Sequence, residues 1–168
     1  METYAYSDDY EAIEMKRCLL TPFYLRKEYL GRENELNFAN YLDQRDDIEW
    51  WMKNGDSGRD YLSIRYFNTV EERTDLFYPD WIYKKKDGTI GIWDTKDGQT
   101  ARSQETKDKA EELQRHIQHL NGYNREFIRY EGGIVMQANG MWYYNSNDTY
   151  TYKKGSTEGW KNMNDLFK

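Results

Sequence analysis

The sequence predicts an α/β fold in which one mixed sheet carries helices on its faces. Three observations support this prediction. The expected elements follow the order helix, strands, helix, strands; an Asp87-Gly88 turn joins two apolar runs; and an apolar stripe of helical spacing separates two groups of strands. A chain of 168 residues without an internal repeat or a linker is close to the commonest domain size, so we expect residues 1–168 to form a single domain.

Two short helices are expected near the start of the chain. The spacing of Ile13, Arg17 and Leu20 predicts a helix over residues 8–20, which stops before a proline. A second helix is expected over residues 33–43, because apolar residues recur there at three-residue steps. Three elements follow: a buried strand over Ile48–Lys53, a turn over Asn54–Gly58 and a strand over Arg59–Phe67.

A β-hairpin and a long helix are expected in the middle of the chain. The hairpin joins Phe77–Lys85 to Thr89–Thr95, and its glycine supplies the positive φ of a primed turn. Ser103 is the expected N-cap of a helix that ends at Asn121-Gly122. The remaining features are the buried stripe of Ala110, Leu113, Ile117 and Leu120, a strand over Gly132–Met136, and a final hairpin of Met141–Tyr144 with Thr149–Tyr152 around Ser146–Asp148.

Composition and charge limit the classes of function. Aromatic residues make up 17% of the chain, with 16 Tyr and 6 Trp, so we expect an aromatic-rich core. Neither an apolar run of membrane-spanning length nor a secretory leader is visible, which predicts a cytoplasmic protein with no membrane partner. The net charge is −6, but the acidic excess lies within residues 1–50, and the rest holds 18 acids and 18 bases. Without a basic stripe, we expect weak nonspecific affinity for DNA.

Asp80, Asp94 and Lys96 form the strongest candidate site. In the predicted hairpin the two acids can converge, and Lys96 projects to the same face as Asp94 because residues two apart in a strand share a side. Two carboxylates bind a hard divalent cation such as Mg²⁺, and the backbone carbonyl of Thr95 is a natural third oxygen ligand. Such a cation neutralises a phosphodiester and activates water. The pattern therefore predicts a metal-dependent phosphodiesterase.

The same residues admit other roles. Lys96 could orient or deprotonate the attacking water or stabilise the charge that develops at phosphorus, and the sequence does not separate these roles. In a purely structural role, Asp80 would cap a turn and Lys96 would pair with Asp94 at the surface. Both acids, however, interrupt strongly apolar strands, where a carboxylate needs a partner or a cation to offset its desolvation.

Three segments carry a resemblance to a known family, namely Trp50–Gly55, Phe77–Ile82 and Ile92–Lys96. They resemble the C-terminal nuclease domain of the restriction subunit of type III restriction enzymes, within the PD-(D/E)xK superfamily, and the likeness runs over about residues 21–136. The resemblance implies a restriction-endonuclease-like fold and a site-specific endodeoxyribonuclease that uses Mg²⁺ or Mn²⁺. It also implies that Glu35 is the superfamily's first-helix acid, which contacts the metal directly or through water.

The resemblance further implies partners and a cellular setting. Such a domain usually follows a superfamily 2 helicase motor, cuts double-stranded DNA and works with a DNA methyltransferase subunit in the prokaryotic cytoplasm. No Gly-x-x-x-x-Gly-Lys-Ser/Thr loop occurs here, so we expect no ATP site in this chain. Either the chain is a C-terminal fragment of a helicase-nuclease polypeptide, or the motor is a separate partner. A second departure is Asp97, which stands where the family often has glycine and is not an expected ligand.

The long helix supplies one more candidate. Lys107 and Gln114 lie seven residues apart on its buried stripe. In related nucleases, Gln or Lys at such a place faces the metal or the scissile phosphate. We expect Gln114 to act there; the alternative is a polar residue that borders the buried face.

Two other functions stay open. The 28 aromatic residues, including Tyr143, Tyr144, Tyr150, Tyr152 and Trp160, could stack bases in a non-catalytic nucleic-acid-binding module, although core packing is the simpler explanation. The same fold and acids could also serve DNA repair or cleave branched or RNA substrates. A nuclease should gain thermal stability from Mg²⁺ or Mn²⁺, whereas a binding module should be indifferent.

Overall fold

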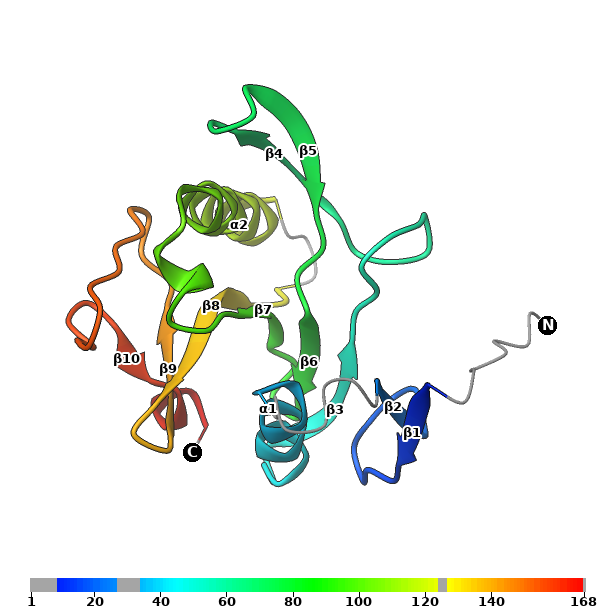
Figure 1. Cartoon of the computed structure of the whole chain (residues 1–168). Coiled ribbons are helices and arrows are strands. Elements are labelled where there is room, and N and C mark those ends of the chain that lie inside the picture. Colours follow the sequence, from blue (N-terminus) through cyan, green and yellow to red (C-terminus); the bar gives the residue numbers. More distant parts are fainter. Residues whose placement is uncertain (1–8, 27–33, 124–126, 168) are drawn as a thin grey trace.

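The computed structural model describes residues 9–26, 34–123 and 127–167. Its centre is a six-stranded, mostly antiparallel sheet accompanied by two α-helices (Figure 1). The strand order is β10, β9, β8, β7, β6, β3, and β7 and β8 are the parallel pair. These strands are β3 (Ile48–Lys53), β6 (Trp81–Lys85), β7 (Ile90–Thr95), β8 (Tyr130–Ala138), β9 (Met141–Asn145) and β10 (Lys161–Asn162).

Two hairpins stand outside the central sheet. β1 (Tyr10–Ile13) pairs with β2 (Phe23–Arg26), and β4 (Ile64–Asn68) pairs with β5 (Arg73–Phe77). In Figure 1 the β4–β5 hairpin projects beyond α2, at the end of the molecule away from α1. Within the described ranges, no helix has the length and apolar character needed to cross a membrane. The helices are α1 (Asn34–Asp43), α2 (Gln104–Gly122) and the short 3₁₀ helices η2 (Thr100–Arg102) and η3 (Met163–Leu166).

The two α-helices cover opposite faces of the sheet. Neighbouring residues of β7 show this division, because Trp93 packs in the cluster that contains Phe38 of α1, whereas Ile92 packs with Leu113 of α2. Side chains of β7 therefore alternate between an α1 face and an α2 face. The expected aromatic-rich core is confirmed, and its fully buried members include Trp51, Trp81, Trp93, Tyr83 and Phe38.

Local sequence signals account for the β6–β7 hairpin and for α2. The two strands pair in antiparallel register, and Gly88 in their turn has a φ of 89°. The Ser103 hydroxyl accepts a hydrogen bond from the Thr106 N–H at 3.1 Å, which caps the first turn of α2. The predictions of a helix over residues 33–43 and of strands over Ile48–Lys53 and Gly132–Met136 are also confirmed, the last within the longer β8.

The predicted helix over residues 8–20 is wrong, because part of this segment forms β1 instead. The Asp43 carboxylate accepts hydrogen bonds from the backbone N–H of Lys16 at 2.9 Å and of Arg17 at 2.7 Å. The Arg17 carbonyl in turn accepts from the Trp51 N–H at 2.9 Å. These partners lie more than twenty residues away, so contacts from α1 and β3 replace the helical bonds that the local spacing predicted.

The predicted final hairpin is also wrong. Thr149–Tyr152 forms no strand, and β9 pairs with β8 on one side and with β10 on the other. The turn lies at Asn139 and Gly140, whose φ angles are 51° and 73°, rather than at Ser146–Asp148. Asn and Gly both tolerate the left-handed region of backbone conformation, so Asn139-Gly140 is a turn signal in the sequence.

Strand boundaries around the first acid differ from those predicted. The strand expected over Arg59–Phe67 begins only at Ile64, and Phe77 belongs to β5 rather than to the start of β6. Residues 78–80 therefore form a break between two strands. Because Pro79 lies in this break, its missing N–H interrupts no ladder, and Asp80 immediately precedes β6.

Replacing Asp43 tests how the N-terminal segment is attached. Its carboxylate also accepts from the Trp51 indole N–H at 3.0 Å, and Asp43 is 9% exposed. We expect Asp43→Ala to lower the free energy of unfolding by about 3 kcal/mol, because buried donors lose a charged acceptor. Urea denaturation measures this change. Asp46→Ala is the matched control: that side chain is 97% exposed and only pairs with Arg17, so its effect should stay below about 0.5 kcal/mol. Equal effects of the two changes would contradict this account.

Candidate active site

The sheet brings Asp80 and Asp94 to the same end of the β6–β7 hairpin. Trp81 pairs with Trp93, and one further step of this antiparallel register places Asp80 opposite Asp94. The Asp80 charge raises the pKa of Asp94, so the two carboxyl groups lie within electrostatic reach of each other. The two acids thus meet at one end of the hairpin, as predicted.

Asp80 is held by the backbone and side chain of Thr95. One of its carboxylate oxygens accepts hydrogen bonds from the Thr95 N–H at 3.1 Å and from the Thr95 hydroxyl at 2.8 Å. Burial alone would raise the pKa of Asp80, but Lys53, Lys96 and the Thr95 donors outweigh it and lower that pKa. Asp80 is therefore ionised at neutral pH. The Thr95 side chain was not predicted as a site group, and the metal contact expected of its carbonyl remains a prediction.

Asp94 lies in a very different environment. Its side chain is only 2% exposed. Burial, reinforced by the neighbouring charge of Asp80, raises the pKa of Asp94 to about 7 even though Lys96 opposes the shift. One carboxylate oxygen, Oδ2, is contacted by the ammonium group of Lys96. Asp94 is thus a buried acid whose charge is only partly compensated by the protein.

Lys96 lies beside Asp94, as predicted from their spacing. Its ammonium group forms an ion pair with Asp94 Oδ2. Burial would lower the pKa of Lys96, but Asp94 and Asp80 reverse that effect and raise it. Lys96 is consequently a cation at neutral pH, which makes it a charge stabiliser rather than a ready base in this state.

Glu35 reaches the site through Lys53, a residue that the sequence interpretation missed. Lys53 Nζ lies 3.2 Å from a Glu35 oxygen and 3.6 Å from Asp80 Oδ1, and it also lies 5.1 Å from the centre of the Trp81 ring. Burial opposes its charge, but Asp80 and Glu35 raise the pKa of Lys53. The sequence did contain a signal for Lys53, because this charged residue ends an apolar strand that was expected to join the sheet.

Gln114 takes a structural position rather than the predicted one. Its side-chain amide donates to the Gly132 carbonyl oxygen of β8 at 2.9 Å, and the residue is buried. Within the described chain, no contact joins it to the two aspartates. Gln114 therefore fits the alternative of a polar residue in the buried face, and its catalytic role has no support from these contacts.

The first turns of α2 supply other charges. Lys109 favours the ionised form of Asp94 electrostatically and forms an ion pair with Glu105. Glu105 favours the cationic form of Lys96 in the same way. Lys107, the other helix candidate, pairs with Glu111 instead. The i,i+4 spacing of Glu105 and Lys109, directly after the N-cap, was the sequence signal for this second charged pair.

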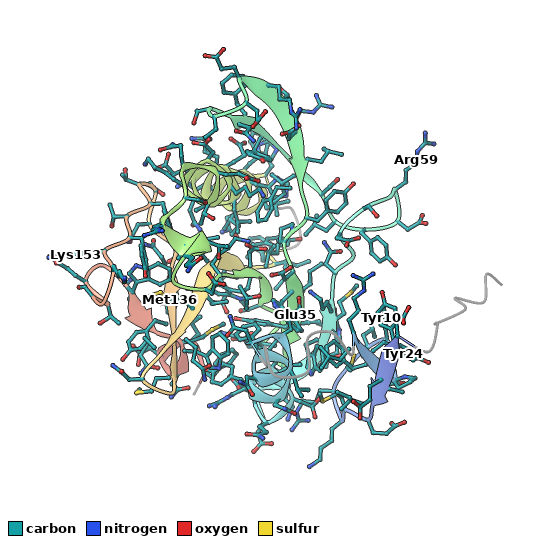
Figure 2. All side chains as sticks on the ribbon, in the orientation of Figure 1. Tyr10, Tyr24, Glu35, Arg59, Met136 and Lys153 are labelled. Carbon is teal, nitrogen blue, oxygen red and sulfur yellow. The ribbon has the colours of Figure 1, made fainter. Side chains whose placement is uncertain are left out.

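A cavity of about 380 Å³ opens beside the acids. Glu35, Lys53 and Asp80 line it, whereas Asp94 and Lys96 are not among its lining residues. Figure 2 shows Glu35 at the start of α1, on the side that faces β3. Asp80 thus connects an open cavity to the enclosed Asp94–Lys96 pair.

The donor set suits a small hard cation. Asp80 and Asp94 each offer one carboxylate at the end of the β6–β7 hairpin. Mg²⁺ typically binds one or two carboxylates and keeps several waters. In the described ranges, no group of three His, Cys, Asp or Glu side chains is arranged to hold a metal. Asp80 is the acid that faces the open cavity, whereas Asp94 is enclosed.

Comparisons with known proteins assign neither a family nor a function. No protein-family model, curated protein or solved structure matches the chain. The chemistry of the site therefore rests on the positions and charges of its residues.

The raised pKa of Asp94 predicts a specific dependence of stability on pH. The unfolded chain ionises this acid near its ordinary pKa of 3.8, whereas the folded protein retains the proton up to about pH 7. The stabilisation is fully present below pH 3.8 and is lost as pH rises through 7. With metal chelated, we expect the wild type to lose about 2–4 kcal/mol relative to Asp94→Asn between pH 4 and 8.

Urea denaturation at several pH values measures this difference. Asp97→Asn is the matched control, because a Thr100 N–H bond to Asp97 lowers its pKa and places its titration below this window. Parallel pH curves for the wild type and Asp94→Asn would show that Asp94 ionises normally in the folded protein.

Proposed function

We propose that this chain is a metal-dependent nuclease domain of the PD-(D/E)xK type that hydrolyses DNA phosphodiester bonds. The observation that carries the proposal is the cluster at the end of the β6–β7 hairpin: buried Asp94, ionised Asp80 beside it, and Lys96, which directly follows β7 and contacts Asp94 Oδ2. This is the minimal charge pattern for binding one divalent cation and one phosphate group.

A purely structural role explains this arrangement poorly. Two adjacent carboxylates disfavour each other's ionised forms, and burial adds to this cost. The two effects raise the pKa of Asp94 to about 7 even though Lys96 contacts its Oδ2. Perturbed acids of this kind concentrate at functional sites. A bound cation would favour the ionised form of Asp94 and reduce this cost.

Each residue of the site has a separate role in the proposed hydrolysis. A divalent cation held by Asp80 and Asp94 would supply Lewis-acid polarisation of the phosphate and a lowered pKa for a bound water. Lys96 holds its proton and places a positive charge at the enclosed end of the site, where negative charge develops on the phosphate oxygens. Thr95 orients Asp80 through its N–H and hydroxyl groups. The Trp81 indole N–H, which donates to the Thr95 hydroxyl at 3.2 Å, orients that hydroxyl in turn.

Lys53 and Glu35 complete the open side of the site. Lys53 bridges Glu35 and Asp80 and keeps the charge of this side balanced. Its ammonium group occupies a position among carboxylates that a cation would also favour. Binding of a metal to Asp80 would therefore weaken this bridge and free Lys53 to contact a phosphate.

The architecture supports a restriction-endonuclease-like fold. A mixed sheet places the acids at one end of a hairpin, one helix precedes them with Glu35 in its first turn, and a second helix follows β7, which carries Asp94 and is directly followed by Lys96. On this basis we assign double-stranded DNA as the substrate, with a fused or associated superfamily 2 motor and a methyltransferase subunit, as in type III restriction enzymes. The resemblance in sequence supports these partners.

A purely aromatic binding module receives no comparable support. Tyr150 and Trp160 are 4% and 7% exposed, and their rings contact each other at 5.9 Å in an edge arrangement. Tyr144 is 7% exposed and contacts the Trp93 ring. These C-terminal aromatic residues serve packing, so the site acids remain the better guide to function.

Loss of either aspartate or of the lysine should stop cleavage. We expect Asp80→Asn, Asp94→Asn and Lys96→Ala each to reduce Mg²⁺-dependent cleavage of plasmid DNA by at least about 100-fold, because each removes a charge that the transition state needs. Gel assays with the purified chain and a complementary motor measure cleavage, and circular dichroism checks the fold.

Asp97→Asn is the control for these variants. Its carboxylate accepts from the N–H groups of Gln99 and Thr100, a role that an Asn oxygen can keep, and it should retain cleavage. Undiminished cutting by purified Asp94→Asn would refute the proposed function.

A further inference from the structure

The cavity beside Asp80 has a wall of aromatic side chains that the hydrolytic site does not use. Tyr10 and Tyr24 of the β1–β2 hairpin, Tyr61 of the loop between β3 and β4, and Tyr78 before β6 all line it, and each is half-buried. Figure 2 shows Tyr10 and Tyr24 together on that hairpin, next to β3. Four tyrosines from three segments thus surround one opening of about 380 Å³, close to the lower end of the usual range for ligand pockets.

The loop between β3 and β4 is built to hold Tyr61 in place. The Asn54 side chain donates to the Leu62 carbonyl at 2.8 Å and accepts from the Leu62 N–H at 3.1 Å, which closes the loop. The Tyr61 ring lies directly on Gly55, where an added Cβ would come within 2.3 Å of a ring carbon. Glycine is therefore required at this position for the ring to occupy it.

Two further contacts fix the other walls. The Tyr78 hydroxyl donates to the Gly58 carbonyl at 3.1 Å, which joins the loop to the break before β6. Arg26 of β2 lies over the Tyr10 ring at 5.7 Å and donates to its hydroxyl at 3.2 Å. The aromatic walls are consequently preorganised, and Arg26 places a cation at the rim.

The cavity combines ring faces with both signs of charge. Its charged lining comprises two cations, Arg26 and Lys53, and three acids, Glu35, Asp56 and Asp80. A purely apolar ligand would desolvate these charged groups and offer them no polar atom in return. A nucleobase offers a π-face for the tyrosines, and the phosphate attached to its sugar offers an anion for Lys53. The acid that faces the cavity, Asp80, is also the one shared with the proposed hydrolytic site.

We propose that this cavity binds an unpaired nucleobase of a DNA strand, stacked against the tyrosines, with the adjoining phosphate directed to Lys53, next to the cation site proposed at Asp80. The assignment deepens the proposed nuclease function and rests on it. If the cavity binds a base in this way, the preferred substrate is a DNA strand with an unpaired nucleotide next to the bond that is cut. An intact duplex would need local opening at this place.

Equilibrium binding of labelled 12-mers tests the proposal, with the whole chain in Ca²⁺ and with fluorescence anisotropy as the readout. The probes are oligothymidylate, an abasic strand of equal length and charge, and the same thymidylate in a duplex. We expect oligothymidylate to bind at least about fivefold more tightly than the abasic strand, because stacking on one aromatic face supplies roughly this factor or more.

Variants identify where the base binds. Tyr61→Ala should abolish the preference for bases, and Gly55→Ala should reduce it because the new methyl group displaces the same ring. Tyr24→Ala on the β1–β2 hairpin gives an independent test if a loop variant does not fold. Tyr123→Ala is the matched control, since this tyrosine is 78% exposed at the C-cap of α2 and lies outside the cavity.

Two results would overturn the inference. Equal affinity for thymidylate and abasic strands would show that only the backbone is bound, and full displacement of oligothymidylate by dTMP at equal affinity would assign a mononucleotide site instead. The parallel cleavage assay separates the two proposals. Asp94-dependent cutting without base preference refutes the cavity assignment alone, whereas base preference without metal-dependent cutting refutes the nuclease.

Discussion

Two like charges meet where β6 begins and β7 ends, and the rest of the site follows from that repulsion. Strand register places Asp80 opposite Asp94, and burial makes their mutual repulsion stronger than it would be in water. The protein compensates unequally: Asp80 receives two donors from Thr95 and the charge of Lys53, whereas the more deeply buried Asp94 receives the Lys96 ion pair. That asymmetry gives one ionised acid and one acid whose pKa is close to neutrality.

The aromatic core is the support for this unfavourable arrangement. Trp81 and Trp93 flank the acids along the two strands and are both fully buried. Buried indole rings bring large apolar areas and few rotatable bonds, so they stabilise the hairpin and fix the positions of adjacent side chains. Trp81 contributes further because its N–H donates to the Thr95 hydroxyl. A strained pair of acids can therefore persist on a rigid hairpin, which a preorganised site requires.

The parts of this architecture that depend on local signals could be predicted from sequence. Gly88 forms the turn between β6 and β7, and Ser103 caps α2, so each acts on residues close to it in the sequence. The spacing of Asp94 and Lys96 likewise determines that their side chains project to the same side. Contacts between distant segments could not be predicted in this way. Pairing with β2 makes Tyr10–Ile13 a strand and Asp43 holds Lys16 and Arg17, whereas Lys53 meets Glu35 and Asp80 because β3 pairs with β6. Gln114 was expected at the acids because related nucleases carry Gln or Lys at such a place, but here it donates to the Gly132 carbonyl.

The central claim is that the Asp80 and Asp94 carboxylates share one divalent cation. Anomalous diffraction from crystals soaked in Mn²⁺ tests this most directly, because it locates the ion independently of activity. The account predicts one strong peak within bonding distance of both carboxylates, with Lys53 moved away from Asp80. Mn²⁺ peaks only elsewhere, with Lys53 and Lys96 still paired to the two aspartates, would contradict it.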